Sequence, residues 1–321
     1  MTIKFLCINC DDVLVKEENQ LICNTCKSIP AIVKNNIIVY KGSNQKTDIF
    51  DKKAVNYLGQ MYSTYTRNTF IDDLNKFNLN NIDFLNKKVG ITTKFWWEKY
   101  IGKIKDKNVL EFGCGVNYLV PYWLLTKNNV VGFDVSKETV FLLKDVVKRL
   151  NLPDKSLQLC VGDADLVSFD QKFDIININN VLHHIDDKRG TLSKLRKMLK
   201  KNGKILIVEP NYYYPFRWIV ETDIFGKFNF VKKYFEKNYL IEKNEKAIKF
   251  KELKRLIKDM NFSTEVNITD PNYLGYATIH FLDKDKFPRL VNLIYYTDKF
   301  FFSKIMPKVM APFEYLIIRP Q

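Results

Sequence analysis

The chain has 321 residues, of which 46% are hydrophobic and 14% aromatic, enough to bury one large core with appendages. Its formal net charge of +15 favours an anionic partner (nucleic acid, a phosphorylated substrate or an acidic membrane surface), unless the lysines are simply solvated. The start of the chain shows no secretory signal, and no run of about 18 apolar residues predicts a membrane span, so we expect a cytoplasmic protein.

Two CxxC pairs lie close to the start of the chain, with twelve residues between them. Two residues between paired cysteines let a tight turn direct both sulfurs at one ion, and two such pairs complete a four-thiolate zinc shell. Residues 13–22 are predicted to form two short strands that bring the pairs together. Such a shell has no open position, so we expect a structural Zn²⁺; four unrelated thiols or a redox pair are the alternatives. The cysteines are Cys7, Cys10, Cys23 and Cys26.

This stretch resembles the small Trm112-like zinc ribbon, in which a short apolar segment follows the second cysteine pair, here SIPAIVKNNIIVY at residues 28–40. Asp11 and Lys27 stand where this module commonly has a glycine. We therefore expect a zinc ribbon at residues 1–42. Its folding free energy should come largely from the metal, because so short a module buries little apolar surface.

Residues 43–107 form a predicted helical bridge to the main domain. The run TTKFWWEKYIGKI has an apolar stripe at helical spacing through Phe95, Trp96, Tyr100 and Ile104. We interpret this stripe as a helix packed on the main domain; a lid over a ligand site is the alternative.

A strand, a glycine-rich turn and a helical pattern follow the bridge. The motif LEFGCG contains a short apolar strand and then Gly113 and Gly115, and the helical pattern covers residues 118–126. Glycine is favoured where the backbone turns sharply or approaches a ligand closely. In open α/β sheets such a turn lies at the carboxyl end of a strand, where ligands bind.

Four further strands alternate with helical patterns, which predicts a mostly parallel sheet. GFDVS ends the second strand at Asp134, where an acid can accept hydrogen bonds from both ribose hydroxyls of an adenosine group. GDAD ends the third strand and provides Asp163, which can accept a hydrogen bond from an adenine amino group. FDIININN is the fourth strand, residues 188–203 are the next helix, and KILIVEP is the fifth strand.

Residues 108–210 resemble the class I S-adenosylmethionine-dependent methyltransferases of the broad small-molecule group. The matching motifs, in order, are LEFGCG, GFDVS, GDAD, FDIININNVLHHI and LKKNGKILIVEP. The resemblance implies an α/β, Rossmann-like sheet of seven strands in residues 108–321, with S-adenosyl-L-methionine as cofactor. A nicotinamide-dependent dehydrogenase, the rival interpretation, would need a glycine at Tyr118 and lacks the last motif. The family commonly has a glycine at Asn117, where asparagine tolerates a left-handed backbone.

The resemblance also implies which residues bind the cofactor. Glu111 and the glycine turn would hold the methionine part, Asp134 the ribose and Asp163 the adenine. For each acid, a solvated loop residue is the alternative. Cys114 and Cys160 are expected to be small buried residues and not nucleophiles. The cofactor-binding residues so implied are Glu111, Gly113, Cys114, Gly115, Asp134, Val135, Asp163, Ala164 and Asn179.

Two histidines follow the fourth strand, in the place where a methyl acceptor would lie. Methyl transfer requires alignment of donor and acceptor and, for a hydroxyl acceptor, removal of a proton, for which histidine is suited near neutral pH. The resemblance implies that His183 or His184 is the base and that Glu209, at the end of the fifth strand, assists it. The alternative is that the histidines only pack. Ubiquinone-type enzymes have glutamates where Asn180 and His183 stand, so a catalytic divalent ion is not implied.

The C-terminal third is rich in aromatic residues and lysine, with expected substrate-recognition insertions at about 212–250 and 283–310. Between them we expect a helix and a strand in KAIKFKELKRLIKDMNFSTEVNITD, with YATIHFLD and FEYLIIRP as the last antiparallel strands. The apolar run at 287–310 is interpreted as a helical cap, a wall for a hydrophobic or glycan-lipid acceptor, or a membrane-surface contact.

The leading hypothesis is a methyltransferase with a small-molecule acceptor: O-methylation of a sugar, a lipid- or phosphate-linked glycan or a natural-product hydroxyl, with N-methylation left open. The second is an rRNA or tRNA methyltransferase, favoured by the basic charge and the four-cysteine module but lacking NPPY or DPPY. The third is a cofactor-binding protein without catalysis, whose ribbon docks a partner.

Overall fold

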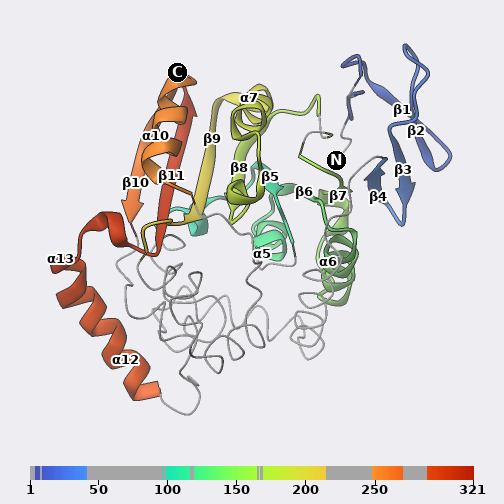
Figure 1. Ribbon diagram of the computed structural model, residues 1–321. Helices are drawn as coiled ribbons and strands as arrows, with labels where there is room; N and C mark the ends of the chain where they lie inside the picture. The colour runs from blue at the N-terminus through green and yellow to red at the C-terminus, as the bar shows by residue number, and fades with distance from the viewer. Residues whose placement is uncertain are drawn as a thin grey trace, which may run out of the picture.

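The computed structural model describes residues 4–7, 9–41, 96, 99–115, 119–164, 166, 169–214, 248–269 and 288–321. In these ranges one sheet of 11 strands runs across the molecule, and helices cover both faces of its central part (Figure 1). The strand order is β1-β2-β3-β4-β7-β6-β5-β8-β9-β11-β10. Strands that are far apart in the sequence, such as β5 and β8, therefore lie next to each other in the sheet.

The five central strands are parallel, which confirms the prediction from the alternating patterns. Their apolar runs follow from burial on both faces, as expected for a parallel sheet covered by helices. Two antiparallel strands extend this part, because β11 pairs with β9 and with β10. The strands are β5 (Asn108–Phe112), β6 (Asn129–Asp134), β7 (Leu157–Val161), β8 (Phe173–Asn179), β9 (Leu199–Pro210), β10 (Phe262–Thr269) and β11 (Phe313–Pro320).

Seven strands, β5 to β11, lie in the described part of residues 108–321, as predicted, but four N-terminal strands join the same sheet and raise its count to 11. The last of them, β4, lies parallel to β7 with Ile38 opposite Cys160. Without β4, the strand β7 would be an edge with unpaired backbone groups, and pairing with the N-terminal module covers that edge. The expected hairpin is present between the first two strands. The four are β1 (Leu14–Glu17), β2 (Gln20–Cys23), β3 (Ala31–Lys34) and β4 (Ile37–Tyr40).

Helices cover the two faces of the parallel strands with separate apolar cores. The helices α5 (Leu119–Leu125) and α6 (Lys137–Arg149) pack on one face, while α7 (Lys188–Lys197) and α10 (Phe250–Asp259) pack on the other. The remaining helical elements are η1 (Ile101–Lys103), η2 (Asp154–Ser156), η3 (Leu182–His184), α12 (Pro288–Thr297), the π-helical η5 (Asp298–Phe302), α13 (Ser303–Ile305) and η6 (Lys308–Met310).

The helix predicted for residues 188–203 is too long, because α7 ends at Lys197 and β9 begins at Leu199. Leu199 pairs with Phe173 of β8, and a Cβ at Gly203 would lie 2.8 Å from the Phe173 carbonyl oxygen. Strand pairing with β8 therefore overrides the helical propensity of this lysine-rich stretch.

The predicted bridge is described only in part. Trp96 is buried, and its ring lies 4.8 Å from that of Tyr100 and 5.1 Å from that of Tyr315 in β11. This contact agrees with a segment packed on the main domain. Phe95 and residues 43–94 lie outside the described residues, as do Asn117, Tyr118 and the expected strand YATIHFLD.

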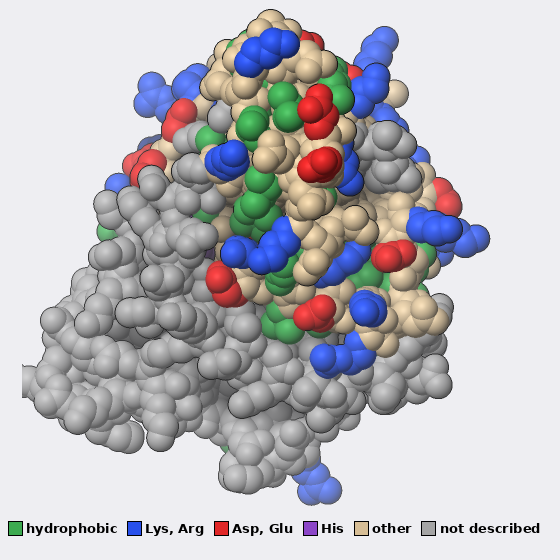
Figure 2. Space-filling view, turned by 90° about the vertical axis from the view of Figure 1, so that its right-hand side faces the viewer, with side chains coloured by type: hydrophobic (Ala, Val, Ile, Leu, Met, Phe, Trp, Pro, Cys, Tyr) green, Lys and Arg blue, Asp and Glu red, His purple; other side chains and the backbone are tan. Residues whose placement is uncertain are grey.

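Charges of both signs are interspersed on the face that carries the N-terminal module and α6. Figure 2 shows Lys and Arg side chains scattered among Asp and Glu, with no continuous basic band over the described residues of this face. None of the helices in the described parts of the chain has the length and hydrophobicity needed to cross a membrane.

Candidate active site and four-cysteine cluster

The glycine turn after β5 is held by the neighbouring strand and requires glycine at its first position. The backbone N–H groups of Gly113 and Cys114 donate to the Phe133 carbonyl at 2.8 and 2.9 Å. Gly113 has a φ of +76°, and a Cβ there would lie 2.1 Å from Val181 Cγ2. Both the left-handed backbone and the close approach exclude a larger residue. The turn is therefore packed directly against the segment that follows β8.

Asp134, at the end of β6, is bonded to this turn. Its Oδ2 accepts from the Gly115 N–H at 2.7 Å and its Oδ1 from the Ser136 N–H at 2.9 Å. A carboxylate has about four acceptor sites, so these bonds are compatible with the ribose contact implied by the sequence. Val135, which is half-buried, lies between Asp134 and Ser136 in the sequence.

Glu111 lies in a different environment from the other predicted cofactor residues. Its carboxylate is fully buried, and it accepts from Trp123 Nε1 and from Asn177 Nδ2, each at 2.8 Å. These bonds tie β5 to α5 and β8 beneath the glycine turn. Sequence reasoning missed both partners; the polar Asn177 between two isoleucines of an apolar strand is the signal that could have found one of them.

The ends of β7 and β8 complete the carboxyl edge. The Gly162 N–H donates to the Asp134 carbonyl at 2.9 Å, which places the half-buried Asp163 and Ala164 beside the end of β6. Asn179 ends β8 and accepts from Asn180 Nδ2 at 3.2 Å. The structure thus brings the predicted cofactor residues of four strands to one edge, at the place where ligands bind in open α/β sheets.

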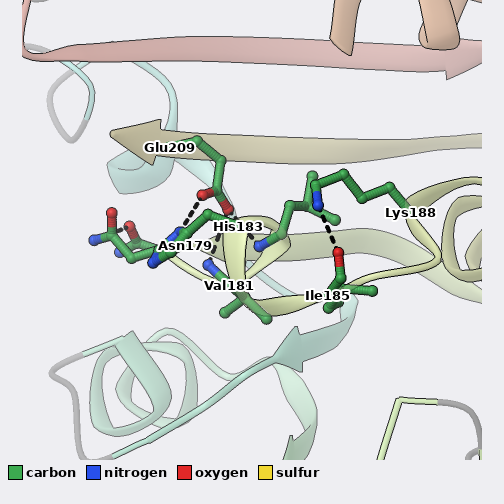
Figure 3. A network of polar contacts seen from close by, with 8 residues as sticks. Asn179, Val181, His183, Ile185, Lys188 and Glu209 are labelled. Carbon is green, nitrogen blue, oxygen red and sulfur yellow. Dashed lines mark hydrogen bonds and ion pairs between the residues drawn. The ribbon is translucent and has the colours of Figure 1, made fainter. Parts of the chain in front are cut away.

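His183 and Glu209 form a buried pair at the same edge. His183 Nδ1 lies 2.6 Å from Glu209 Oε2, and the Glu209 side chain is fully buried. The other oxygen, Oε1, accepts from the backbone N–H groups of Val181 and Leu182 at 2.9 and 2.7 Å (Figure 3). The carboxylate is therefore fixed by three contacts, and it fixes the histidine ring in turn.

The two histidines differ in their surroundings. His183 is buried and contacts Glu209, whereas His184 is exposed, with its ring centroid 3.9 Å from that of His183. A carboxylate next to Nδ1 favours the tautomer with the proton on Nδ1 and the basic lone pair on Nε2. This arrangement is the one used by a histidine that accepts a proton from a substrate.

The four predicted metal ligands are brought together in the N-terminal module. Their Sγ atoms all lie within 4.8 Å of one another. Asp11 and Lys27 have φ values of 56° and 58°, so each adopts the left-handed backbone of the glycine it replaces. Hydrogen bonds from the hydroxyl and backbone of Ser28 lower the pKa of Cys26 to about 6. A backbone hydrogen bond at Asp12 lowers the pKa of Cys10, but the neighbouring thiols outweigh it and raise that pKa to about 12, so the proton is shared unequally within the cluster.

The two remaining cysteines are buried in the main sheet, as predicted. Burial raises the pKa of Cys114 and of Cys160 well above the usual range for a thiol. Neither thiol is suited to act as a nucleophile near neutral pH, since the thiolate is the reactive form.

Comparison with known proteins identifies the central part of the chain. Residues 110–205 match the family model described as a methyltransferase domain. An uncharacterized methyltransferase of Schizosaccharomyces pombe is 26% identical over 121 residues, covering 36% of this chain and 40% of that protein. The demethylmenaquinone methyltransferase of Lactobacillus johnsonii is 28% identical over 220 residues, covering 64% of this chain and 88% of that protein.

A third relative is the tRNA U34 carboxymethyltransferase of Campylobacter fetus, 33% identical over 105 residues, which cover 32% of this chain and 36% of that protein. The chain thus spans less than half the length of the Schizosaccharomyces and Campylobacter relatives that it matches. The family match, the strand order and the glycine turn agree: residues 110–205 are similar to a methyltransferase domain and lie in an open sheet whose central strands are parallel.

Proposed function

We propose that this protein transfers a methyl group from S-adenosylmethionine to a hydroxyl group of a small molecule, with His183 as the proton acceptor. The observation that carries the proposal is the buried contact between His183 Nδ1 and Glu209 Oε2, at 2.6 Å, at the carboxyl edge of the sheet. The small-molecule acceptor is supported by the demethylmenaquinone enzyme, which is similar over more of the chain than the other two relatives.

The residues at the edge fit the cofactor. Gly115, where a Cβ would meet nothing closer than Asp134 Oδ2 at 4.0 Å, leaves the turn open to close approach of a ligand. Asp134 ends β6, and Asp163 follows the end of β7 by two residues. In the proposal, Asp134 binds the ribose hydroxyls and Asp163 the adenine amino group, while Asn179 lines the floor. Glu111 acts on the methionine part by supporting the turn from beneath. When bound, S-adenosylmethionine supplies a methyl group already activated on a sulfonium.

The chain's own contribution to the reaction is orientation and proton removal. His183 Nε2 would accept the proton of the acceptor hydroxyl, while the cofactor, when bound, would supply the methyl group and keep the electron pair of the broken methyl–sulfur bond. Glu209 holds the ring in this tautomer and stabilises the imidazolium that forms, because it stays bonded to two backbone N–H groups. The same His183–Glu209 pair would also accept a proton from an amine acceptor. We choose a hydroxyl acceptor because methylation of a hydroxyl gains more from a base that removes its proton.

The N-terminal module is proposed to be a structural zinc ribbon at residues 1–42. Four sulfurs within 4.8 Å of one another match a closed tetrahedral thiolate shell. The proposed organisation continues with a bridge at 43–107 and a catalytic domain at 108–321, with insertions at about 212–250 and 283–310.

An RNA acceptor is the second candidate, since a relative acts on tRNA by its name and the net charge is +15. The interspersed charges of the face in Figure 2 do not provide the basic stripe expected of a nucleic-acid groove. Transfer of a labelled methyl group separates the two: we expect label in a small-molecule extract and not in RNA. Label in RNA alone would overturn the proposed acceptor class.

Cofactor binding is tested independently of the acceptor by calorimetry. The wild-type chain should bind S-adenosylmethionine, and Asp134→Ala should weaken binding by about tenfold or more through loss of charge-assisted hydrogen bonds. Binding without transfer to any acceptor would favour a non-catalytic cofactor-binding protein.

A further inference from the structure

The C-terminal segment 288–308 carries an unusual concentration of exposed apolar side chains. Six of the nine large hydrophobic side chains that are exposed in the described part of the chain lie between residues 290 and 305. Leu293 and Ile305 are each 62% exposed. Monomeric soluble proteins rarely leave so many large apolar residues together in water, so this surface indicates a partner. The six are Leu290, Leu293, Tyr296, Phe300, Phe301 and Ile305.

The spacing of these residues places most of them on one side of the segment. Leu290, Leu293 and Tyr296 recur every three residues in α12, and Phe300 follows four residues later in η5. The rings of Tyr296 and Phe300 are stacked with an interplanar angle of 11°. Figure 1 shows α12 at the periphery of the molecule, away from α5 and α6. The segment therefore exposes a row of apolar side chains on helical elements that lie at the periphery of the described residues.

The charges of the segment are almost all positive. Its sequence contains four basic residues and one acid, Asp298, which is buried. Arg289, Lys304 and Lys308 are exposed beside the apolar side chains. Aromatic and aliphatic residues flanked by cations are typical of helices that lie in the headgroup region of an anionic membrane.

The residues that follow the segment join it to the sheet beside the proposed base. The Asn211 side chain donates to the Ala311 carbonyl at 2.8 Å, and its backbone N–H donates to the Pro312 carbonyl at 2.9 Å. In the following strand, Glu314 lies opposite Glu209. The exposed Tyr212 follows Asn211 at the same edge. A surface bound by the segment would therefore lie close to the carboxyl edge.

We propose that residues 288–308 dock on the surface of an anionic membrane and present the carboxyl edge to a methyl acceptor carried by the lipid phase. A methyl acceptor in the lipid phase rests on the proposed function, whereas membrane docking does not. The segment lies on the membrane and does not cross it, which agrees with the lengths of the described helices.

Sedimentation with vesicles tests the docking. The full chain should bind vesicles that contain phosphatidylcholine and phosphatidylglycerol in equal parts, and bind phosphatidylcholine alone more weakly. Leu293→Asn combined with Phe301→Asn should lower binding about tenfold or more through lost apolar burial. Lys304→Gln combined with Lys308→Gln should lower binding to the anionic vesicles about tenfold. The matched controls Val15→Asn and Lys16→Gln, exposed in the N-terminal module, should bind as the wild type does.

Three outcomes would overturn the proposal. The first is that the wild type binds neither kind of vesicle. The second is that the Leu293/Phe301 variant binds as tightly as the controls. The third is a dimer, seen by light scattering, that the same variant separates without any vesicle binding, which would assign the surface to a second copy. Cofactor calorimetry on each variant keeps these results apart from failure of the proposed function, because the substituted residues lie outside the cofactor site.

Discussion

The carboxyl edge of the sheet and the four-cysteine module hold their functional groups in place by different means. At the edge, the carboxylates of Glu111 and Glu209 are fully buried and bonded to neighbours within a large core. In the module, two of the four sulfurs are exposed, and short strands of four residues surround them. A large core can fix buried polar groups by packing and hydrogen bonds, whereas a module of about 40 residues depends on a cross-link such as a metal.

The two regions are nevertheless joined. Phe5, two residues before the first cysteine, lies with its ring 5.5 Å from that of Phe169, and β4 pairs with β7. A Cβ at Gly162 would lie 3.2 Å from the Tyr40 Cβ, so the module packs directly beside the proposed adenine site. Loss of the metal should therefore disrupt the fold of the module strongly and lower the affinity for the cofactor only weakly.

The largest expected effect is the loss of the metal. Chelation or Cys26→Ser should abolish stoichiometric zinc and unfold residues 4–41, since a structural zinc contributes about 10–16 kcal/mol of apparent binding free energy. Hydrogen exchange should show lost protection in β1–β4 and retained protection in β8 and β9, with cofactor affinity lowered a few-fold. The control Cys160→Ala should keep its zinc. A Cys26→Ser variant with a full complement of zinc would contradict the four-thiolate shell.

The second effect concerns turnover. His183→Ala should lower kcat about 10²–10⁴-fold, the usual contribution of a positioned base, with cofactor affinity unchanged. Glu209→Gln should also lower kcat, because it removes the charge that stabilises the imidazolium. Initial rates with the acceptor identified by label transfer measure both.

His184→Ala is the matched control for these variants, since its ring lies beside that of His183 but is exposed. It should change kcat by only a few-fold. Full turnover by both histidine variants would remove the proton-acceptor assignment.

A smaller effect is expected for stability at the glycine turn. Glu111→Gln replaces one acceptor oxygen by a donor, which leaves Trp123 Nε1 or Asn177 Nδ2 unsatisfied in a buried site. The free energy of unfolding should fall by about 1–3 kcal/mol, measured by urea denaturation. Glu138→Gln, exposed in α6, should change it by less than about 0.5 kcal/mol. Equal stability of the two variants would contradict the role of Glu111 in stabilising the glycine turn.

The smallest expected effect is on stability and concerns Asp174, at the edge of the sheet opposite the carboxyl edge. Burial raises the pKa of Asp174, but the hydrogen bonds from Lys200 and from the Asn108 N–H outweigh it and hold the pKa below its ordinary value. Such a carboxylate contributes stability above the pKa of the unfolded chain, and that contribution is lost as the pH falls through the lower pKa of the folded state.

Asp174→Asn should therefore cost about 0.5–1 kcal/mol at neutral pH, as expected for a partly exposed ion pair. The difference from the wild type should shrink in acid. Urea midpoints compared at neutral pH and at about pH 3 provide the measurement. A difference that grows toward low pH would contradict the assigned direction of the pKa shift.

Much of the fold and of the candidate site was accessible from local patterns. The spacing of the cysteines, the alternation of apolar strands with helices, and the acids near the ends of β6, β7 and β9 depend on residues that are neighbours in sequence. For this reason the parallel sheet, the hairpin of the module and the position of His183 at the carboxyl edge agree with the sequence analysis.

The features that the sequence did not reveal depend on contacts between distant segments. The union of β4 with β7, the early end of α7 against β8, and the buried partners of Glu111 all arise where one segment satisfies backbone or polar groups of another. Sequence by itself determined which chemical groups this protein carries and on which local elements. Only the tertiary structure decided which of those groups are buried together, because burial makes an unpaired hydrogen-bonding group costly and so selects the partner.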